Sequence, residues 1–306
     1  MNLIFGDGRA LRAYAASAEA RPQLWRAVLC LIVVFAVIFG ASLLIGFALM
    51  RIAPEANPLA SLEALSTTGG VLFALATFLL WWPGLWLGMK LMHKRGLGSL
   101  FPATQRGPVR LFATGFAVAV GFGALSIAVG AFASPIERSD LGVGTWLALL
   151  PLALILLLIQ TGAEELLFRG YLLQQLAARF HGHWIAWGLI PSLIFGALHY
   201  NPTAPGGAEV AVAVTALGGF VMAVVTARTG GLAAAWGLHM GVNTVALLII
   251  GPPDYLSGLS LWHWTGDEAE FSRLAWSDFI WIAAIALGAA WWFRPPSSRQ
   301  CRHNSK

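Results

Sequence analysis

Charged side chains are scarce in this sequence. Asp, Glu, Lys and Arg make up 11% of its 306 residues, less than half the share of about 25% that is usual in a soluble domain. Hydrophobic residues make up 58%, and the mean hydropathy is +0.73. This composition excludes an ordinary soluble domain and predicts a polytopic membrane protein. The two cysteines, Cys30 and Cys301, do not form a disulfide framework.

Acidic residues are fewer than basic ones, which gives a net charge of +5 and a pI near 9.7. In a soluble protein this balance would suggest nucleic acid as a partner. In a membrane protein the basic excess more often lies in cytoplasmic loops, so we expect membrane lipid around the chain and no nucleic acid. Fourteen tryptophans fit this interpretation, because indole rings anchor at the level of the lipid headgroups.

Eight apolar segments predict membrane-spanning helices, since a hydrocarbon core of ~30 Å needs roughly 20 residues per helix. The first is far longer than the apolar part of a signal peptide, so we expect it to be retained. The predicted fold class is an all-α, polytopic membrane protein with about eight transmembrane helices. The predicted segments are 27–50, 68–92, 111–133, 142–163 (with a continuation to 180), 184–200, 208–227, 231–250 and 276–293.

The basic residues indicate how these segments are oriented. With a cytoplasmic N-terminus, sixteen of the nineteen Lys and Arg residues fall on the cytoplasmic side, as the positive-inside rule predicts. Only Arg51, Arg138 and Arg273 fall outside, and the outer loop 251–275 carries four acidic residues. We therefore expect an integral membrane protein with both termini in the cytoplasm. The small, Ala- and Trp-rich chain is typical of a bacterial inner membrane.

Ionisable and amide side chains within the predicted spans gather between residues 160 and 245. Such groups are rare and costly in a membrane, and they are usually functional. The first three spans contain no acid, and their one histidine, His93, lies at a basic edge. The clustering therefore predicts a functional site, built from Glu164, Glu165, Arg169, His199, His239 and Asn243.

The two adjacent glutamates differ in their surroundings. Glu165 and Arg169 are four residues apart on one helical face, which predicts a structural ion pair. Glu164 lies on another face, with Phe168 rather than a cation at i+4, so it is available for chemistry. An alternative interpretation places both carboxylates among the lipid headgroups at a helix end. The apolar, helix-like continuation YLLQQLAARF at 171–180 argues against that alternative.

The two histidines each share a helical face with a second residue. The segment PSLIFGALHYNP places Phe195 four residues before His199, and AAWGLHMGVNTV places Asn243 four residues after His239. A lone histidine in a span is often a hydrogen-bonded packing residue. Two of them, together with an unpaired glutamate and an asparagine, favour a shared site.

Helix geometry predicts which of these groups meet. With a turn at 181–183, Glu164 and His199 both lie roughly 26 Å from it, at 1.5 Å per residue, so they face each other at one level. His239 lies only ~12 Å beyond the turn at 228–231. The depths agree only if the first hairpin protrudes into the cytoplasm or a helix is bent. The GxxxG pattern of Gly237 and Gly241 predicts a close approach by another helix.

This set of side chains suits hydrolysis of an amide within the bilayer. A carboxylate and an imidazole around one water molecule can activate it, by general-base action alone or by sharing a metal ion. A second imidazole and an amide can stabilise the developing oxyanion. Other protease signatures are missing, namely HExxH, GxSG, GxGD and paired aspartates within spans.

Three short motifs, in order, resemble those of the CPBP family of intramembrane proteases, which includes the CAAX prenyl endopeptidases. The family patterns EExxxR, FxxxH and HxxxN correspond to EELLFRG at 164–170, FGALH at 195–199 and HMGVN at 239–243. Any one motif alone is a weak signal, whereas the complete set is specific. The resemblance covers about residues 141–250 and implies a four-helix catalytic core.

The resemblance also implies roles for single residues. It makes Glu164 the catalytic glutamate and His199 the histidine that activates water, with His239 and Asn243 stabilising the oxyanion. Family members are described both as metal-dependent and as metal-free, so a Zn²⁺ ion is left open as a cofactor. Its ligands would be Glu164, His199 and His239, and the supporting residues are Glu165, Arg169 and Phe195.

The implied activity is cleavage of a peptide bond in a membrane-associated or lipidated peptide or protein. Prenylated CAAX proteins are not expected in a bacterium, so the resemblance implies peptide-bond cleavage without naming the peptide. Because basic loops border the catalytic hairpin, we expect a site that faces the cytoplasm. The predicted regions are a cytoplasmic segment (1–26), three accessory helices (27–140), the catalytic core (141–250), and an outer loop, last helix and tail (251–306).

Three other functions use some of the same residues. A membrane cytochrome with His199 and His239 as haem ligands would leave Glu164 and Asn243 without a role. A transporter with a Glu–His relay would predict internal repeats, and the sequence has none that we detect. A regulator without proteolytic activity is the third alternative, and the complete motif set argues against it.

Overall fold

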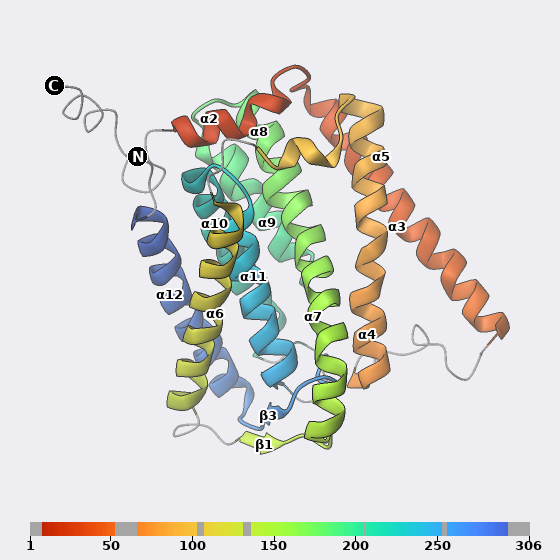
Figure 1. Cartoon of the computed structure of the whole chain (residues 1–306), viewed down its shortest axis with the longest axis vertical. Helices are drawn as coiled ribbons and strands as arrows, with labels where there is room; N and C mark the ends of the chain where they lie inside the picture. The colour runs from red at the N-terminus through yellow and green to blue at the C-terminus, as the bar shows by residue number, and fades with distance from the viewer. Residues whose placement is uncertain are drawn as a thin grey trace.

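The computed structural model describes residues 8–52, 66–102, 107–130, 136–202, 204, 206–252 and 256–292. Cys301 and the last residues of the predicted spans 111–133 and 276–293 lie outside this part of the chain. In Figure 1 the long helices run side by side, with the short helices α2 and α8 at one end of the bundle and strands β1 and β3 at the other. We call these the α2 end and the sheet end.

The first half of the described chain contains the accessory helices. Backbone groups within a membrane must be hydrogen-bonded inside the protein, which favours helices in such an apolar sequence. The short helix α2 and a 3₁₀ turn precede the first long helix, and Figure 1 shows this long helix, α3, leaning away from the bundle toward the sheet end. The bounds are α2 Arg9–Ala15, η1 Ala16–Ala18, α3 Leu24–Ile52, α4 Thr68–Thr77, η4 Phe78–Leu80, α5 Trp81–His93, η5 Leu97–Leu100 and α6 Pro108–Gly130.

The second half holds the three motifs. Here the described chain has three π-helical turns, one between α7 and α8, one before α9 and one after α11; such turns are frequent at functional sites. A small sheet of order β1-β3-β2 closes the sheet end, with β1 antiparallel and β2 parallel to β3. The bounds are β1 Ile136–Arg138, α7 Val143–Glu165, η6 Leu166–Leu172, α8 Leu173–Arg179, η7 Ile185–Leu189, α9 Ile190–Ala197, α10 Ala208–Thr229, α11 Ala233–Thr244, η8 Val245–Ile249, β2 Ile250–Gly251, β3 Trp262–Trp264 and α12 Glu268–Trp292.

The predicted fold class is confirmed. Five described helices are long and apolar enough to cross a membrane, namely Leu24–Ile52, Thr68–His93, Pro108–Gly130, Val143–Arg179 and Ala208–Thr229. Two predicted spans correspond to shorter apolar helices, Ile185–Ala197 and Ala233–Ile249. The described part of the last predicted span, 276–292, lies within α12. The chain is therefore an integral membrane protein built from helices.

One helix bears on the question of depth. The 37 residues Val143–Arg179 form a single run, about 55 Å long at 1.5 Å per residue, whereas the hydrocarbon core is ~30 Å thick. The run also contains Pro151 and the π turn η6, so the protruding hairpin and the bent helix both stay predictions. The chain turns back at Gly182, whose φ of +81° favours glycine. The headgroup interpretation of the glutamates is wrong, because Glu164 and Glu165 are both buried inside the protein.

The predicted close approach at the GxxxG pattern is confirmed, and the neighbour is α6. A methyl group added at Gly241 would lie 2.8 Å from the carbonyl oxygen of Phe116 and 2.6 Å from the Cβ of Ala119. One added at Gly237 would overlap the carbonyl oxygen of Phe112. The two backbones touch because these positions lack side chains. This contact fixes α11, and with it His239 and Asn243.

The largest buried cluster surrounds η6 and includes the N-terminal helix. Leu11 and Tyr14 of α2 and Cys30 of α3 belong to the same cluster as Leu166 and Tyr171 of η6. The segment 1–26 was predicted only as a cytoplasmic extension. Its described part is instead packed into the core at the α2 end, directly over the first motif.

Glycine substitutions test the contact between α6 and α11. We expect Gly241→Ala to destabilise the protein by about 1–3 kcal/mol, the usual cost of overpacking a tight interface. Gly121→Ala is the matched control, because a methyl group at Gly121 meets nothing within 4 Å, and alanine favours helix more than glycine does. Thermal unfolding in detergent should show a lower midpoint for Gly241→Ala alone. Equal midpoints would contradict the contact.

Candidate functional site

The carboxylate of Glu165 lies at the centre of the site. Its Oε1 atom accepts a hydrogen bond from Nη1 of Arg169 at 2.9 Å, which confirms the predicted ion pair. The same atom lies 2.9 Å from Nδ1 of His239. Since a carboxylate only accepts, Nδ1 of His239 carries the proton. Glu165 is 0% exposed, and its other oxygen, Oε2, is buried without a hydrogen-bond partner in the described part of the chain.

Glu164 reaches the other side of the same imidazole. Its Oε2 atom lies 3.4 Å from Nε2 of His239, so the ring stands between the two glutamates. The Oε2 atom is buried and has no hydrogen-bond partner within the described part of the chain. An unsatisfied buried carboxylate oxygen is costly. A water molecule or a substrate group at this position would remove that cost.

His199 is held by its own helix. Its Nδ1 atom lies 2.8 Å from the carbonyl oxygen of Phe195, so Nδ1 donates and Nε2 is left as an acceptor. The Phe195 ring is 4.7 Å from the ring of His199 and 6.0 Å from that of His239, measured between centroids. The phenyl group therefore sets the positions of both imidazoles, which gives the predicted supporting residue a physical task.

Asn243 has a partner that the sequence analysis missed. Its Nδ2 atom donates to Oε1 of Gln160 at 2.9 Å, and Gln160 is buried. The sequence did contain a signal for Gln160, because this residue precedes Glu164 by four positions and lies on the same helical face. It is also the one amide in the apolar run that ends α7. Gln160 thus links α7 to α11 at the level of the motifs.

Arg169 has further neighbours, of which Tyr14 and Gly219 were also missed by the sequence analysis. The hydroxyl of Tyr14 donates to the backbone carbonyl of Arg169 at 3.1 Å. The guanidinium carbon of Arg169 lies 4.3 Å from the centroid of the Phe195 ring, a cation–π geometry. Gly219 of α10 makes room for this stack, since a methyl group there would lie 2.9 Å from Nη2 of Arg169. Sequence spacing cannot reveal contacts between residues so far apart in the chain.

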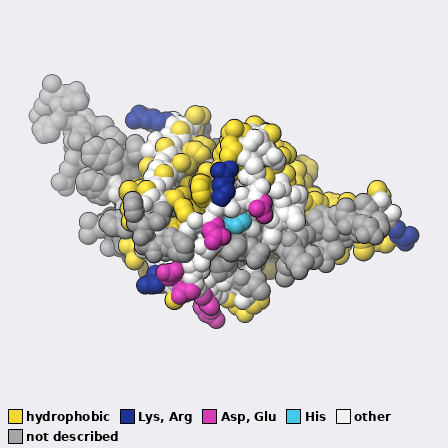
Figure 2. Space-filling view, turned by 90° about the horizontal axis from the view of Figure 1, so that it is seen from below, with side chains coloured by type: hydrophobic (Ala, Val, Ile, Leu, Met, Phe, Trp, Pro, Cys, Tyr) yellow, Lys and Arg dark blue, Asp and Glu magenta, His cyan; other side chains and the backbone are white. Residues whose placement is uncertain are grey.

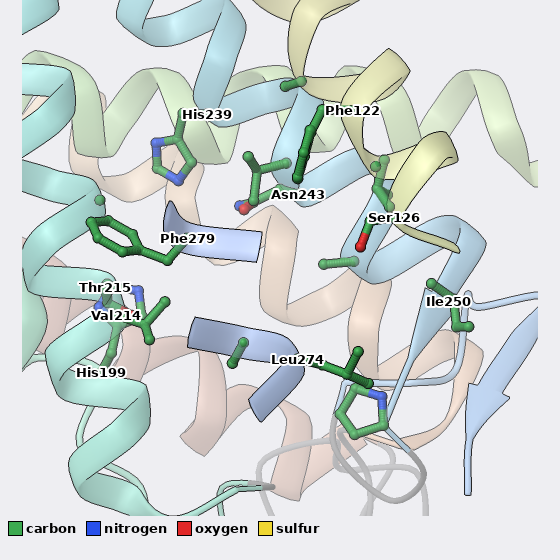
Figure 3. Close-up of a pocket in the computed structure, with 18 of the residues that line it drawn as sticks. Phe122, Ser126, His199, Val214, Thr215, His239, Asn243, Ile250, Leu274 and Phe279 are labelled. Carbon is green, nitrogen blue, oxygen red and sulfur yellow. The ribbon is translucent and has the colours of Figure 1, made fainter. Parts of the chain in front are cut away.

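A cavity of about 420 Å³ adjoins these residues, and His199, His239 and Asn243 all line it. Figure 3 shows the three side chains among apolar residues, and the lining residues come from α6, α9, α10, α11 and α12 as well as from the sheet. The structure thus brings these three together at one cavity, with Glu164 next to the ring of His239. The cavity continues toward Pro252 and Trp264 at the sheet end, whereas we expected an opening toward the basic loops. At the end where the basic loops lie, α2 packs over the first motif, and Tyr14 of α2 donates to the carbonyl group of Arg169.

The positions of the histidine ring nitrogens bear on the Zn²⁺ prediction and on the cytochrome alternative. The described residues contain no group of three His, Cys, Asp or Glu side chains that could hold a metal ion, so the Zn²⁺ ligand set of Glu164, His199 and His239 stays a prediction. Both ring nitrogens of His239 face carboxylates. A haem iron would need one of them, which argues against the cytochrome alternative.

Comparison with known proteins agrees with this geometry. Residues 146–245 match the family model of type II CAAX prenyl endopeptidases, described as Rce1-like. The family resemblance is confirmed. All three motifs lie within this Rce1-like segment, which supports a membrane peptidase of the CAAX-protease type in general. The chain is also 29% identical over 227 residues to the uncharacterized protein YyaK of Bacillus subtilis, an alignment that covers 70% of this chain and 72% of YyaK. No solved structure gives a significant match.

Removal of Arg169 tests the central ion pair of the Rce1-like segment. We expect Arg169→Leu to destabilise the protein by about 3–5 kcal/mol, because it leaves the buried charge of Glu165 uncompensated. The double variant Arg169→Leu with Glu165→Gln should recover much of this loss, since the charge is gone. Thermal unfolding of both variants in detergent measures the difference. A double variant that is no more stable than Arg169→Leu alone would refute the pairing.

Proposed function

We propose that the protein is an intramembrane endopeptidase. It hydrolyses a peptide bond of a membrane-associated or lipidated peptide or protein with a water molecule activated by Glu164 and His199. The observation that carries this proposal is the buried Oε2 atom of Glu164, which lacks a partner in the described chain beside an imidazole that lines a cavity. The Rce1-like match supports the same reaction class.

The attack begins at Glu164. Its carboxylate takes a proton from the water molecule while the water oxygen bonds to the carbonyl carbon of the peptide. The lone pair on Nε2 of His199 accepts the second hydrogen of the same water and orients it. His239 cannot rotate away, because its Nδ1–H is held by Glu165. The proton on Glu164 then passes to the leaving nitrogen as the C–N bond breaks.

The negative charge on the carbonyl oxygen needs hydrogen-bond donors that are already in place. Asn243 supplies one. An amide nitrogen carries two hydrogens, and the bond to Gln160 uses one of them, which leaves the other for the oxyanion. His239 is the second predicted donor, through Nε2, in the form of the ring that already carries a proton on both nitrogens before the attack. Both residues line the cavity on α11.

The cofactor and the location complete the proposal. If Zn²⁺ binds, the proposed ligands are Glu164, His199 and His239, and the metal would supply a Lewis acid for the water. No step above depends on it. We place the protein in a bacterial inner membrane with both termini in the cytoplasm. The distribution of Lys and Arg supports this orientation.

Glu164→Gln tests the proposed function. We expect a loss of about 10²–10⁴-fold in cleavage rate, the usual contribution of a general base, with unchanged folding because glutamine keeps the shape of the side chain. Peptide termini would be compared in membranes from cells that make equal amounts of wild type and variant. New termini found only with the wild type would identify the substrate. Identical profiles, with any phenotype kept by the variant, would refute the proposal in favour of a regulator.

Gln160→Leu tests the orientation of Asn243. On the peptide identified by that comparison, we expect kcat to fall about 10-fold to 100-fold, since removing an oxyanion donor outright costs about 10²–10³, and KM to stay nearly unchanged. Thr244→Val is the matched control, because Thr244 donates only within its own helix, to Met240. A rise in KM with kcat unchanged would show that Gln160 has no part in orienting the donor.

A further inference from the structure

The cavity extends from the motif residues toward the sheet end. Beyond the motif residues, its walls come from α6, α10, α12 and η8 and from the sheet itself. Figure 3 shows several of these wall residues below His239 and Asn243. The wall residues include Phe122, Ser126, Thr215, Pro252, Trp264 and Leu274.

The opposite side of the site is closed by packed side chains. Tyr14 and Tyr171 are each at most 1% exposed, and the hydroxyl of Tyr171 lies 2.8 Å from Nε2 of His93. Arg95 donates to Gln174 at 2.6 Å. Burial raises the pKa of Tyr14 above its usual range and lowers the pKa of Arg95 to about 10, as expected where water is excluded. Side chains therefore fill the described part of this layer.

The sheet end is acidic, and Figure 2 shows acidic side chains gathered on this face. Three exposed arginines lie at this end, Arg51, Arg138 and Arg273, and the described carboxylates there outnumber them. By the positive-inside rule this face lies outside the cytoplasm. The start of α12 brings its acidic turn directly beside cavity residues Phe271 and Leu274. The described acidic residues of this end are Glu137, Asp140, Glu209, Asp267, Glu268 and Glu270.

The volume limits what the cavity can hold. At about 420 Å³ it falls within the range of about 300–1,000 Å³ that small-molecule sites occupy. About one turn of an α-helix, ~5.4 Å long and about 10 Å wide, would fill this volume. A whole transmembrane helix is therefore too large, whereas a few residues of unwound chain fit. The mainly apolar walls favour apolar side chains.

We propose that substrates reach this site from the non-cytoplasmic side, through the sheet end. The occupant is a short, unwound, apolar stretch of a membrane-anchored peptide or protein, flanked by basic residues that meet the acidic face. This inference rests on the proposed function and deepens it, since it gives the side and the chemical class of the substrate. Among wall residues, Thr215 lies on the access path and outside the proposed catalytic machinery.

A cysteine at Thr215 tests this path. In a Cys301→Ser background, the buried Cys30 is the remaining native thiol. Thr215→Cys is treated with a membrane-impermeant maleimide in intact cells and after permeabilisation. His181→Cys is the matched control at the α2 end, where the His181 side chain is 58% exposed. We expect modification of Thr215→Cys in intact cells, with loss of cleavage, and modification of His181→Cys only after permeabilisation.

The alternative results are distinct. If Thr215→Cys reacts only after permeabilisation, or in neither condition, the proposed path is wrong. It is also wrong if cleavage that depends on Glu164 continues after Thr215→Cys has been fully modified from outside. The labelling itself needs no activity. An inactive wild type with Thr215→Cys labelled in intact cells would therefore count against the peptidase function and not against access from the sheet end.

Discussion

The site depends on one buried carboxylate, that of Glu165. A charge inside a membrane protein is tolerated only when neighbours compensate it, and here one oxygen atom receives both the guanidinium of Arg169 and Nδ1 of His239. This shared contact joins α7 to α11 across 74 positions of sequence. It also fixes the tautomer of His239, so that Nε2 points at Glu164. Glu165 thereby holds in place the ring that faces Glu164.

Several weaker features hold this arrangement in place. The π turn η6 begins directly after Glu165 and contains Arg169, whose carbonyl group is bonded by Tyr14 from the N-terminal helix. Gly219 leaves the space in which Arg169 stacks on Phe195, and the glycines of α11 press that helix against α6. Positions that lack side chains thus matter as much as the polar groups, because they decide how closely the helices approach.

The two ends of the molecule differ in packing as well as in charge. At the α2 end, aromatic and amide side chains fill the space above the motifs, whereas at the sheet end a cavity leads to them. A hydrolase in a membrane must admit water and substrate while keeping its charged groups away from lipid. A site closed at one end and open at the other meets both requirements.

Sequence alone was sufficient for the helical membrane fold, the pairing of Glu165 with Arg169, the close approach at Gly241 and the family resemblance. Each follows from a local rule, namely the length of apolar runs, the i, i+4 spacing, or a short motif. Gln160, Tyr14 and Gly219 could not be assigned in this way, because their partners lie tens to more than a hundred residues away. The direction of the cavity was likewise decided by tertiary structure. Charge patterns report which side of the membrane a loop occupies, but only the packing of α2 against η6, and of α12 beside α6 and α10, determines which end is filled by side chains.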